Sequence, residues 1–256
     1  MKSRRTRFLL LVVLVAAAAA SAPAQDANHQ HQWSYAGETG PQHWGDLKAE
    51  YATCKTGKEQ SPIDIRSATK APLPAIRFQY KSSPLRIINN GHTIQVNYAP
   101  GSFITVGDKR YELKQFHFHH PSEERIQGKS YAMVAHLVHA DSQGNLAVIA
   151  VLLTPGKANR SLDEIWTHMP RTEGKEEAIA GVEVNADNLL PHNLTYYTYP
   201  GSLTTPPCSE GVTWFVLKTP VQISPEQVNA FARIFPDNAR PIQPLNGRVV
   251  KESEQR

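Results

Sequence analysis

The 256-residue chain has few cysteines, only Cys54 and Cys208, and few long apolar runs. Beyond the N-terminus, no segment approaches the roughly 18 consecutive apolar residues that indicate a membrane-spanning helix. Internal repeats, low-complexity tracts and linkers are also missing. Because 40% of the residues are hydrophobic and 20% are charged, there is enough apolar material for a core, and wholesale disorder is excluded.

Acidic residues are absent before Asp26, whereas four basic residues near the start account for the whole formal net charge of +4. From residue 25 onward, 23 basic residues balance 23 acidic ones. A chain without net charge presents no basic field to nucleic acid or to an anionic membrane, so neither is expected as a partner.

The first residues have the organisation of a signal peptide. The basic start is followed by an apolar run of 13 residues, 8–20, and by the A-x-A pattern Ala22-Pro23-Ala24. We predict that residues 1–24 are removed and that residues 25–256 are exported, to the periplasm or out of the cell. The alternative is an uncleaved anchor, although the run is short for one. The segment Ser3-Arg4-Arg5 leaves both the general secretory and the twin-arginine route open.

Export changes the interpretation of the two cysteines. In an oxidising compartment Cys54 and Cys208 have only each other to pair with, which predicts a disulfide. A bridge across most of the mature chain also favours one domain. Two buried free thiols are the alternative.

Short β-like runs alternate with turn residues along the mature chain. They cover residues 85–88, 92–98, 103–106, 111–119, 131–139, 146–153 and 212–217. Two helices have capping-box starts, Ser161 with Glu164 and Ser224 with Gln227, and Pro236 is expected to stop the second. The sequence predicts a mainly β fold, a single domain built on a large, mostly antiparallel twisted sheet with a few short surface helices.

The clearest chemical signal is Gln115-Phe116-His117-Phe118-His119. Alternate side chains of a strand share a face, so His117 and His119 project together and can supply two corners of a tetrahedral zinc site. The next run carries His136 and His139, of which strand parity allows only one to join the pair. Three histidines would leave a fourth zinc position open, as in catalytic sites. Buried histidines that hold only hydrogen bonds are the alternative.

Together with Ala135-His136-Leu137-Val138-His139 and residues 199–207, this motif resembles the α-class carbonic anhydrases of the bacterial, exported type. Matching segments also occur at residues 31–35, 60–65, 89–92 and 240–245, so the resemblance covers most of the mature chain. It implies the α-carbonic anhydrase fold and reversible hydration of carbon dioxide to bicarbonate and a proton by a zinc-bound hydroxide. The implied cofactor is Zn²⁺, the small-molecule partners are carbon dioxide and bicarbonate, and a homodimer is left open.

The resemblance also implies roles for individual residues. The zinc ligands would be His117, His119 and His136. His139 would be structural on the opposite face, and Thr204 would hold the hydroxide while donating its own proton to Glu123. His92 would be the proton shuttle, because an imidazole with a pKa near 6.5 exchanges protons readily at neutral pH. After Asn89-Asn90-Gly91, however, His92 also fits an exposed turn histidine.

The substrate pocket of the family falls on mostly apolar positions, which suit carbon dioxide. They are Val138, Val148, Leu203, Thr204, Thr205 and Trp214. Two other readings compete with an enzyme. A binding module that keeps the fold without turnover would be expected to lose a zinc histidine, and a structural zinc site would need four protein ligands.

One position departs from the family. The residue two before the third zinc histidine is usually a glutamate that accepts the outer ring N–H, and here it is Val134. A buried N–H left unpaired costs roughly 1–3 kcal/mol. We therefore predict that a backbone carbonyl, a side chain from elsewhere or a water pairs with the free nitrogen of His136.

Overall fold

Strands make up most of the regular structure in residues 32–254, the part of the chain that this computed structural model describes. The strands are β1 (Asp64–Ile65), β2 (Thr69–Ala71), β3 (Ile76–Gln79), β4 (Ser83–Asn89), β5 (Ile94–Asn97), β6 (Phe103–Val106), β7 (Lys109–His119), β8 (Arg125–Ile126), β9 (Met133–Ala140), β10 (Leu146–Pro155), β11 (Glu177–Val184), β12 (Tyr196–Ser202), β13 (Glu210–Leu217), β14 (Val221–Ile223) and β15 (Lys251–Ser253). The α-helices are α1 (Trp44–Leu47), α2 (Thr53–Thr56), α3 (Asp163–Thr167) and α4 (Pro225–Ala232). The 3-10 helices are η1 (Gly37–Thr39), η2 (Ala49–Tyr51), η3 (Arg160–Leu162) and η4 (Ala186–Leu189). The predicted signal peptide lies outside the described residues.

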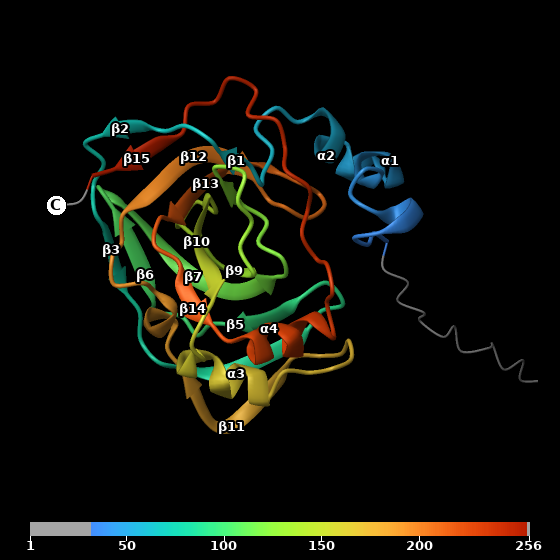
Figure 1. The fold of residues 1–256 in the computed structure, drawn as a ribbon, viewed down its shortest axis with the longest axis vertical. Helices are drawn as coiled ribbons and strands as arrows, with labels where there is room; N and C mark the ends of the chain where they lie inside the picture. Colours follow the sequence, from blue (N-terminus) through green and yellow to red (C-terminus); the bar gives the residue numbers. More distant parts are fainter. Residues whose placement is uncertain (1–31, 255–256) are drawn as a thin grey trace, which may run out of the picture. The chain divides into compact units, whose positions relative to one another are not determined.

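One 13-stranded sheet organises this part of the chain, in the order β11-β4-β5-β7-β9-β10-β13-β12-β15-β2. Three further strands lie off this path: β14 pairs with β10, β6 pairs with β7, and β3 pairs with β6. Most neighbours are antiparallel, which confirms the predicted fold class. The exceptions in the sheet are β10, which is parallel to β13 and to β14, and β15, which is parallel to β2. Figure 1 shows β7, β9 and β10 near the middle of the fold, with α3 and α4 on one side. A separate two-stranded pair joins β1 to β8.

The central strands are buried on both faces, and each face has its own core. Phe116 and Leu137 belong to one core, where Ile165 of α3 and Phe231 of α4 also pack. The opposite core contains alternate residues of the same strands and Trp214 of β13. Because side chains alternate along a strand, the histidines that flank Phe116 and Leu137 are directed to the second face.

The second predicted helix begins as its sequence indicates. The backbone N–H of Gln227 donates to the Ser224 hydroxyl oxygen at 3.2 Å, and the Gln227 side chain accepts from the Ser224 N–H at 3.2 Å. This reciprocal capping box opens α4, with Pro225 in its first turn. The helix ends at Ala232, four residues before Pro236.

The capping box predicted at Ser161 is wrong. The side chain of Asn159 accepts a hydrogen bond of 3.0 Å from the backbone N–H of Ser161, and the 3-10 helix η3 begins directly after Asn159. The helical turn therefore starts earlier than the serine, which lies inside η3 and makes no cap for α3. An asparagine two residues upstream supplied the competing acceptor.

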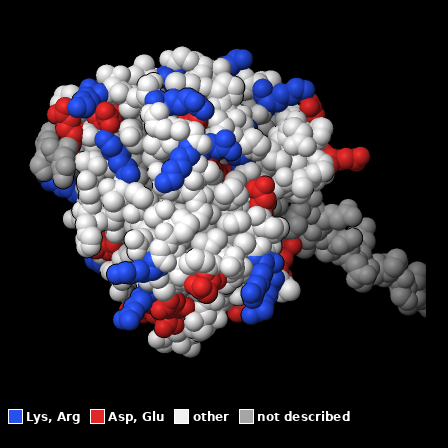
Figure 2. Space-filling model, in the orientation of Figure 1, with Lys and Arg blue, Asp and Glu red and all other residues white. Residues whose placement is uncertain are grey.

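The surface of the fold carries both signs of charge. On the face drawn in Figure 2, basic and acidic side chains are scattered among uncharged ones. Within residues 32–254, no helix is both long and apolar enough to cross a membrane.

Candidate active site

The three histidines predicted to bind metal converge on one face of the sheet. His117 and His119 lie on β7, and His136 lies directly opposite His117 on the antiparallel strand β9. Each residue offers one ring nitrogen, and these nitrogen atoms all lie within 4.8 Å of one another. Of the two histidines on β9, the structure therefore places His136 with the pair.

Hydrogen bonds hold the outer nitrogens of His117 and His119. Nδ1 of His117 lies 2.8 Å from Oε1 of Gln115, and Nδ1 of His119 lies 2.7 Å from the backbone oxygen of Asn238. Because both partners accept, these bonds assign each ring proton to Nδ1 and leave a lone pair on Nε2. Nε2 of His119 is buried and has no hydrogen-bond partner among the described residues, as suits a nitrogen reserved for a metal ion.

His136 is held in the opposite sense. Its Nε2 lies 2.9 Å from Oε1 of Glu124, a fully buried side chain in the segment after β7, so Nδ1 is left for the histidine cluster. Val134 is buried in the apolar core on this face. The prediction that a backbone carbonyl, a side chain from elsewhere or a water pairs with the free nitrogen of His136 is confirmed, and of these three the partner is a side chain.

Burial keeps two of the three rings neutral. It lowers the pKa of His117 to about 3, with the neighbouring His136 adding to the shift, and it lowers the pKa of His119 well below its usual range. Burial also acts to lower the pKa of His136, but the charge and the hydrogen bond of Glu124 raise it above its ordinary value. Neutral imidazole is the form that coordinates metal ions, so His117 and His119 are ready to bind at neutral pH.

Glu123 and Thr204 form a second polar group beside the histidines. Oε1 of Glu123 accepts a 2.8 Å hydrogen bond from the backbone N–H of Arg240. Burial raises the pKa of Glu123 to about 7, whereas His136, the Arg240 N–H and the Thr204 hydroxyl act to lower it. No group in residues 32–254 reaches Oε2 of Glu123 with hydrogen-bond geometry, so this oxygen remains an acceptor for the neighbouring hydroxyl.

A cavity of about 160 Å³ opens beside the histidines. It is lined by Trp33, Tyr35, Asn90, His92, Thr93, Gln95, Gln115, His117, His119, His136, Val138, Val148, Leu203, Thr204, Thr205 and Trp214. All the positions predicted for the substrate pocket are among them, while Glu123 lies outside the lining. The register explains the apolar wall, because Val148 of β10 pairs with both Val138 of β9 and Trp214 of β13.

His92 lies in the turn between β4 and β5 and is half-buried at the cavity wall. Its backbone N–H donates to the side-chain oxygen of Asn90 at 3.0 Å, which fixes the turn. Its ring stacks on Trp33, with centroids 3.6 Å apart and planes 7° from parallel. The predicted shuttle is thus a wall residue with a defined ring position.

His139 lies apart from the cavity, on the other face of β9. Its Nε2 is 2.7 Å from the hydroxyl of Tyr80, and its Nδ1 is 3.3 Å from the backbone oxygen of Ala147. Burial lowers the pKa of His139 to about 3. This environment fits the structural role that the resemblance implies.

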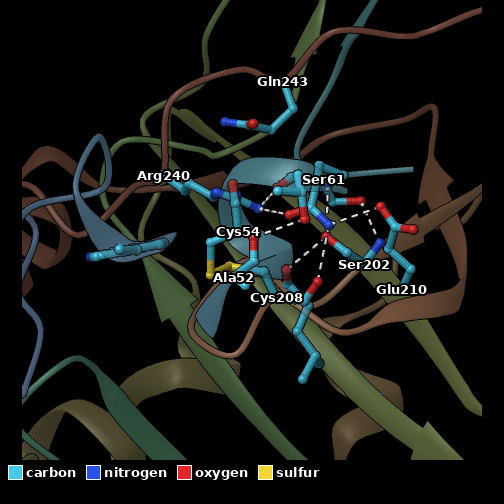
Figure 3. The surroundings of a disulfide bond; sticks show 12 residues. Ala52, Cys54, Ser61, Ser202, Cys208, Glu210, Arg240 and Gln243 are labelled. Atoms are coloured by element: carbon cyan, nitrogen blue, oxygen red, sulfur yellow. Dashed lines mark hydrogen bonds between the residues drawn. A yellow bond between two sulfur atoms is a disulfide. The ribbon is translucent and has the colours of Figure 1, made fainter. Parts of the chain in front are cut away.

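The disulfide between Cys54 and Cys208 is present, with the two Cα atoms 5.0 Å apart. Figure 3 shows that Arg240 reaches into this region. Its Nη2 donates to the backbone oxygen of Cys54 at 3.0 Å, and its Nη1 donates to the oxygen of Ser61 at 2.8 Å. The backbone N–H of Cys208 donates to Thr205 at 2.8 Å, so the bridge lies one turn from the Thr204 loop.

Three residues that hydrogen-bond to the histidines were not predicted from the sequence. Gln115 carries a usable signal, since it lies two residues before His117 on the same strand face. Glu124 follows Glu123 directly and looks like surface charge. Asn238 contributes a backbone oxygen, which no side-chain pattern reports.

Comparison with known proteins places these features in a family. The family model for eukaryotic-type carbonic anhydrase matches residues 39–254. A carbonic anhydrase of Neisseria gonorrhoeae is 48% identical over 231 residues, 90% of each chain, and one of Nostoc sp. is 44% identical over 226 residues, 86% of each chain. The solved structure of Thermovibrio ammonificans α-carbonic anhydrase with the inhibitor sulfanilamide is 48% identical, with a TM-score of 0.83, and covers 87% of this chain and 98% of that chain.

Proposed function

The chain belongs to the eukaryotic-type carbonic anhydrase family, and from this premise we propose that it hydrates carbon dioxide reversibly at a zinc ion held by His117, His119 and His136. The observation that carries the proposal is the convergence of three imidazole nitrogens at the wall of the cavity. Three imidazole nitrogen ligands suit Zn²⁺ and leave one position open, which is the arrangement of catalytic zinc sites. When bound, zinc supplies a Lewis acid that lowers the pKa of a coordinated water to about 7, the value already established for carbonic anhydrases.

Thr204 and Glu123 would select the orientation of the attacking oxygen. A Glu123 carboxylate can only accept, so the Thr204 hydroxyl must donate its proton to Glu123. The threonine oxygen then has only lone pairs to offer to the cavity. It would accept a hydrogen bond from the attacking oxygen and leave the lone pair of that oxygen directed at carbon dioxide.

The apolar wall would bind carbon dioxide next to this oxygen. Val138, Val148, Leu203 and Trp214 present hydrocarbon surface, and Thr205 is half-buried at the polar margin. A small ligand without charge needs such a dry surface more than it needs hydrogen bonds. Bicarbonate, being charged, gains less from these side chains and leaves more easily.

His92 would carry the proton between the site and the buffer. Its ring lines the same cavity as the three histidines, and its stacking on Trp33 keeps the ring at the wall. An imidazole can accept a proton on one nitrogen and release another from the second nitrogen. Waters in the cavity would connect the ring to the reacting oxygen.

The disulfide supports export of the mature chain. Such bridges persist in oxidising compartments and are rare in the cytosol. We propose that residues 1–24 act as the signal peptide and that residues 25–256 form the catalytic domain, in the periplasm or outside the cell. N-terminal sequencing of the exported protein, with Gln25 expected as its first residue, tests the cleavage site.

Zinc content and carbon dioxide hydration, measured on the same preparation, test the proposed function. We expect one zinc per chain, loss of hydration after chelation and recovery on adding zinc. His119→Ala should lose both properties, whereas Glu176→Ala, which removes a carboxylate paired with Arg86 near β11, should lose neither. A zinc-loaded protein without hydration activity would overturn the enzymatic assignment.

A further inference from the structure

Glu124 is completely buried, yet its carboxylate has one hydrogen-bond partner, the imidazole of His136. Oε1 lies 2.9 Å from Nε2 of the ring, and Oε2 has no hydrogen-bond partner within residues 32–254. Burying a carboxylate is costly unless it is paired, so an apolar residue would fill this space at less cost. The hydrogen bond to His136 is therefore the interaction that accounts for a carboxylate at this position.

The backbone around Glu124 is anchored so that the carboxylate has a fixed origin. The Ser122 hydroxyl donates to the backbone oxygen of Glu124 at 2.9 Å and accepts from the backbone N–H of Tyr131 at 2.9 Å. The N–H of Arg125 donates to the oxygen of Ile63 at 3.3 Å. The residues on both sides of Glu124 are thus tied to other segments, and the side chain reaches His136 from a rigid base.

Glu123 also lies near the ring, but its Oε2 is 3.8 Å from Nδ1, beyond hydrogen-bond distance, so among the described residues Glu124 alone makes a hydrogen bond with the ring. Trp214 meets the His136 ring edge to face, with centroids 4.9 Å apart, and such a contact tolerates a half-turn of the imidazole. Val134, on the same face of β9, offers only methyl groups. A half-turn would exchange nitrogen and carbon positions, so an acceptor at Nε2 is what keeps Nδ1 toward His117 and His119.

We propose that Glu124 is the positioning residue of the metal site, which fixes the rotation and the tautomer of His136 so that Nδ1 carries the lone pair for the metal ion. This inference rests on the proposed function, which supplies that ion. Glu123 and Glu124 are consecutive but serve different groups, the first Thr204 and the second His136. The carboxylate thus comes from the segment after β7, while the strand position Val134 is apolar.

Zinc release to a chelator is the direct test, because it needs no catalytic turnover. Outer hydrogen-bond partners of metal-bound histidines typically contribute 10–100-fold to metal affinity, so Glu124→Ala should release zinc about 10–100-fold faster than the parent. Glu124→Gln keeps an oxygen acceptor without the charge and should give an intermediate rate. Glu176→Ala is the matched control for loss of a carboxylate and should release zinc at the parental rate.

Rescue from the strand separates positioning from mere packing. The double variant Glu124→Ala with Val134→Glu places a carboxylate on the same face as His136 and should slow zinc release again, whereas Val134→Glu alone should not improve on the parent. The ¹⁵N shifts of His136 in the metal-free protein supply a second readout. At alkaline pH, where the His136 ring is neutral, they should report a single tautomer protonated at Nε2 in the parent and a mixture in Glu124→Ala.

The outcomes keep this inference distinct from the proposed function. If the parent binds no zinc, the proposed function fails. If the parent binds zinc and Glu124→Ala has the same zinc release rate and the same ¹⁵N shifts as the parent, then only the positioning role is overturned. Glu124→Gln takes the place of the alanine variant in this comparison if that variant does not fold. An unchanged tautomer combined with faster release would also refute it, since the carboxylate would then act only through its charge.

Discussion

Replacing both Cys54 and Cys208 with serine is predicted to destabilise the fold strongly while leaving the active-site loop in place. The bridge joins α2 to the turn that follows Thr204, and its cysteines are 154 residues apart in the sequence. Serine is nearly isosteric with cysteine, so the substitution removes the cross-link with little change of volume.

The magnitude follows from the length of the closed loop. In the chain-entropy model, opening a loop of 154 residues returns roughly 17 cal/mol/K to the unfolded chain, which is about 5 kcal/mol at 25 °C. Natural domains are stable by about 5–15 kcal/mol. The variant should therefore fold at 25 °C with a much smaller free energy of unfolding, and bound zinc should restore part of that free energy.

The site itself should change less, because the surrounding hydrogen bonds use backbone atoms. Arg240 donates to the backbone oxygen of residue 54 at 3.0 Å, Gln60 donates to that of residue 208 at 3.0 Å, and the N–H of residue 208 donates to Thr205. All three bonds survive in the serine variant. Carbon dioxide hydration by the folded variant at 25 °C should therefore match the parent.

Guanidinium unfolding of the metal-free parent, with the disulfide intact and reduced, and of the double serine variant provides the measurement. Besides a lower midpoint, the unfolding slope should rise, since an unbridged chain exposes more surface when unfolded. A decrease of less than about 1 kcal/mol in the free energy of unfolding, relative to the parent with its disulfide intact, would refute the entropic account. A large loss of hydration activity in the fully folded variant would refute the claim that hydrogen bonds alone hold the loop.

Three further predictions address other parts of the fold. His139 has a pKa of about 3 in the folded protein and about 6.5 in the unfolded chain. The free energy of unfolding of the metal-free protein should therefore fall as the pH drops from about 6.5 toward 3, by up to about 1.4 kcal/mol per pH unit. In denaturant titrations, His139→Gln should reduce this pH dependence. Gly201→Ala should destabilise the protein by about 1–3 kcal/mol in the same assay, because a Cβ atom there would lie 2.7 Å from Cδ1 of Trp214. An unchanged denaturation midpoint would contradict this and show that Trp214 moves aside without cost. His92→Ala should slow hydration without loss of zinc, and added imidazole buffer should recover part of the rate; no recovery would exclude His92 as the shuttle.

Strand parity and register explain why the ligand set could be predicted. The spacing of His117 and His119 requires one face, and a side chain from the neighbouring strand can join only from a position of matching parity. His136 meets that condition by pairing directly with His117, whereas His139, three residues further on, cannot. The local pattern limits the third ligand to one of His136 and His139, and the family resemblance selects His136, the residue that the register places opposite His117.

The hydrogen-bond partners around the site depend on chain segments that the local pattern does not connect. Asn238 lies 119 residues after His119 in the sequence and holds its ring through a backbone oxygen. Arg240 holds Glu123 through a backbone N–H, 117 residues away. Main-chain donors and acceptors are the same for nearly every residue type, so no composition or motif marks these positions. The parallel pairing of β10 with β13 is likewise a product of long connections.

Glu124 meets a chemical requirement that the sequence reveals, although the sequence pattern does not indicate which residue meets it. Valine at position 134 implies that the outer nitrogen of His136 needs another acceptor, because a buried N–H is rarely left unpaired. That requirement follows from the sequence, but the source of the acceptor does not, since it depends on how Ser122 and Tyr131 shape the segment after β7. In sequence, Glu123-Glu124 followed by Arg125 looks like solvated charge, yet both carboxylates are buried and face different partners. A missing group at one strand position is therefore best sought among polar residues near the end of the neighbouring strand, where a short, anchored segment can direct a side chain back onto the same histidine.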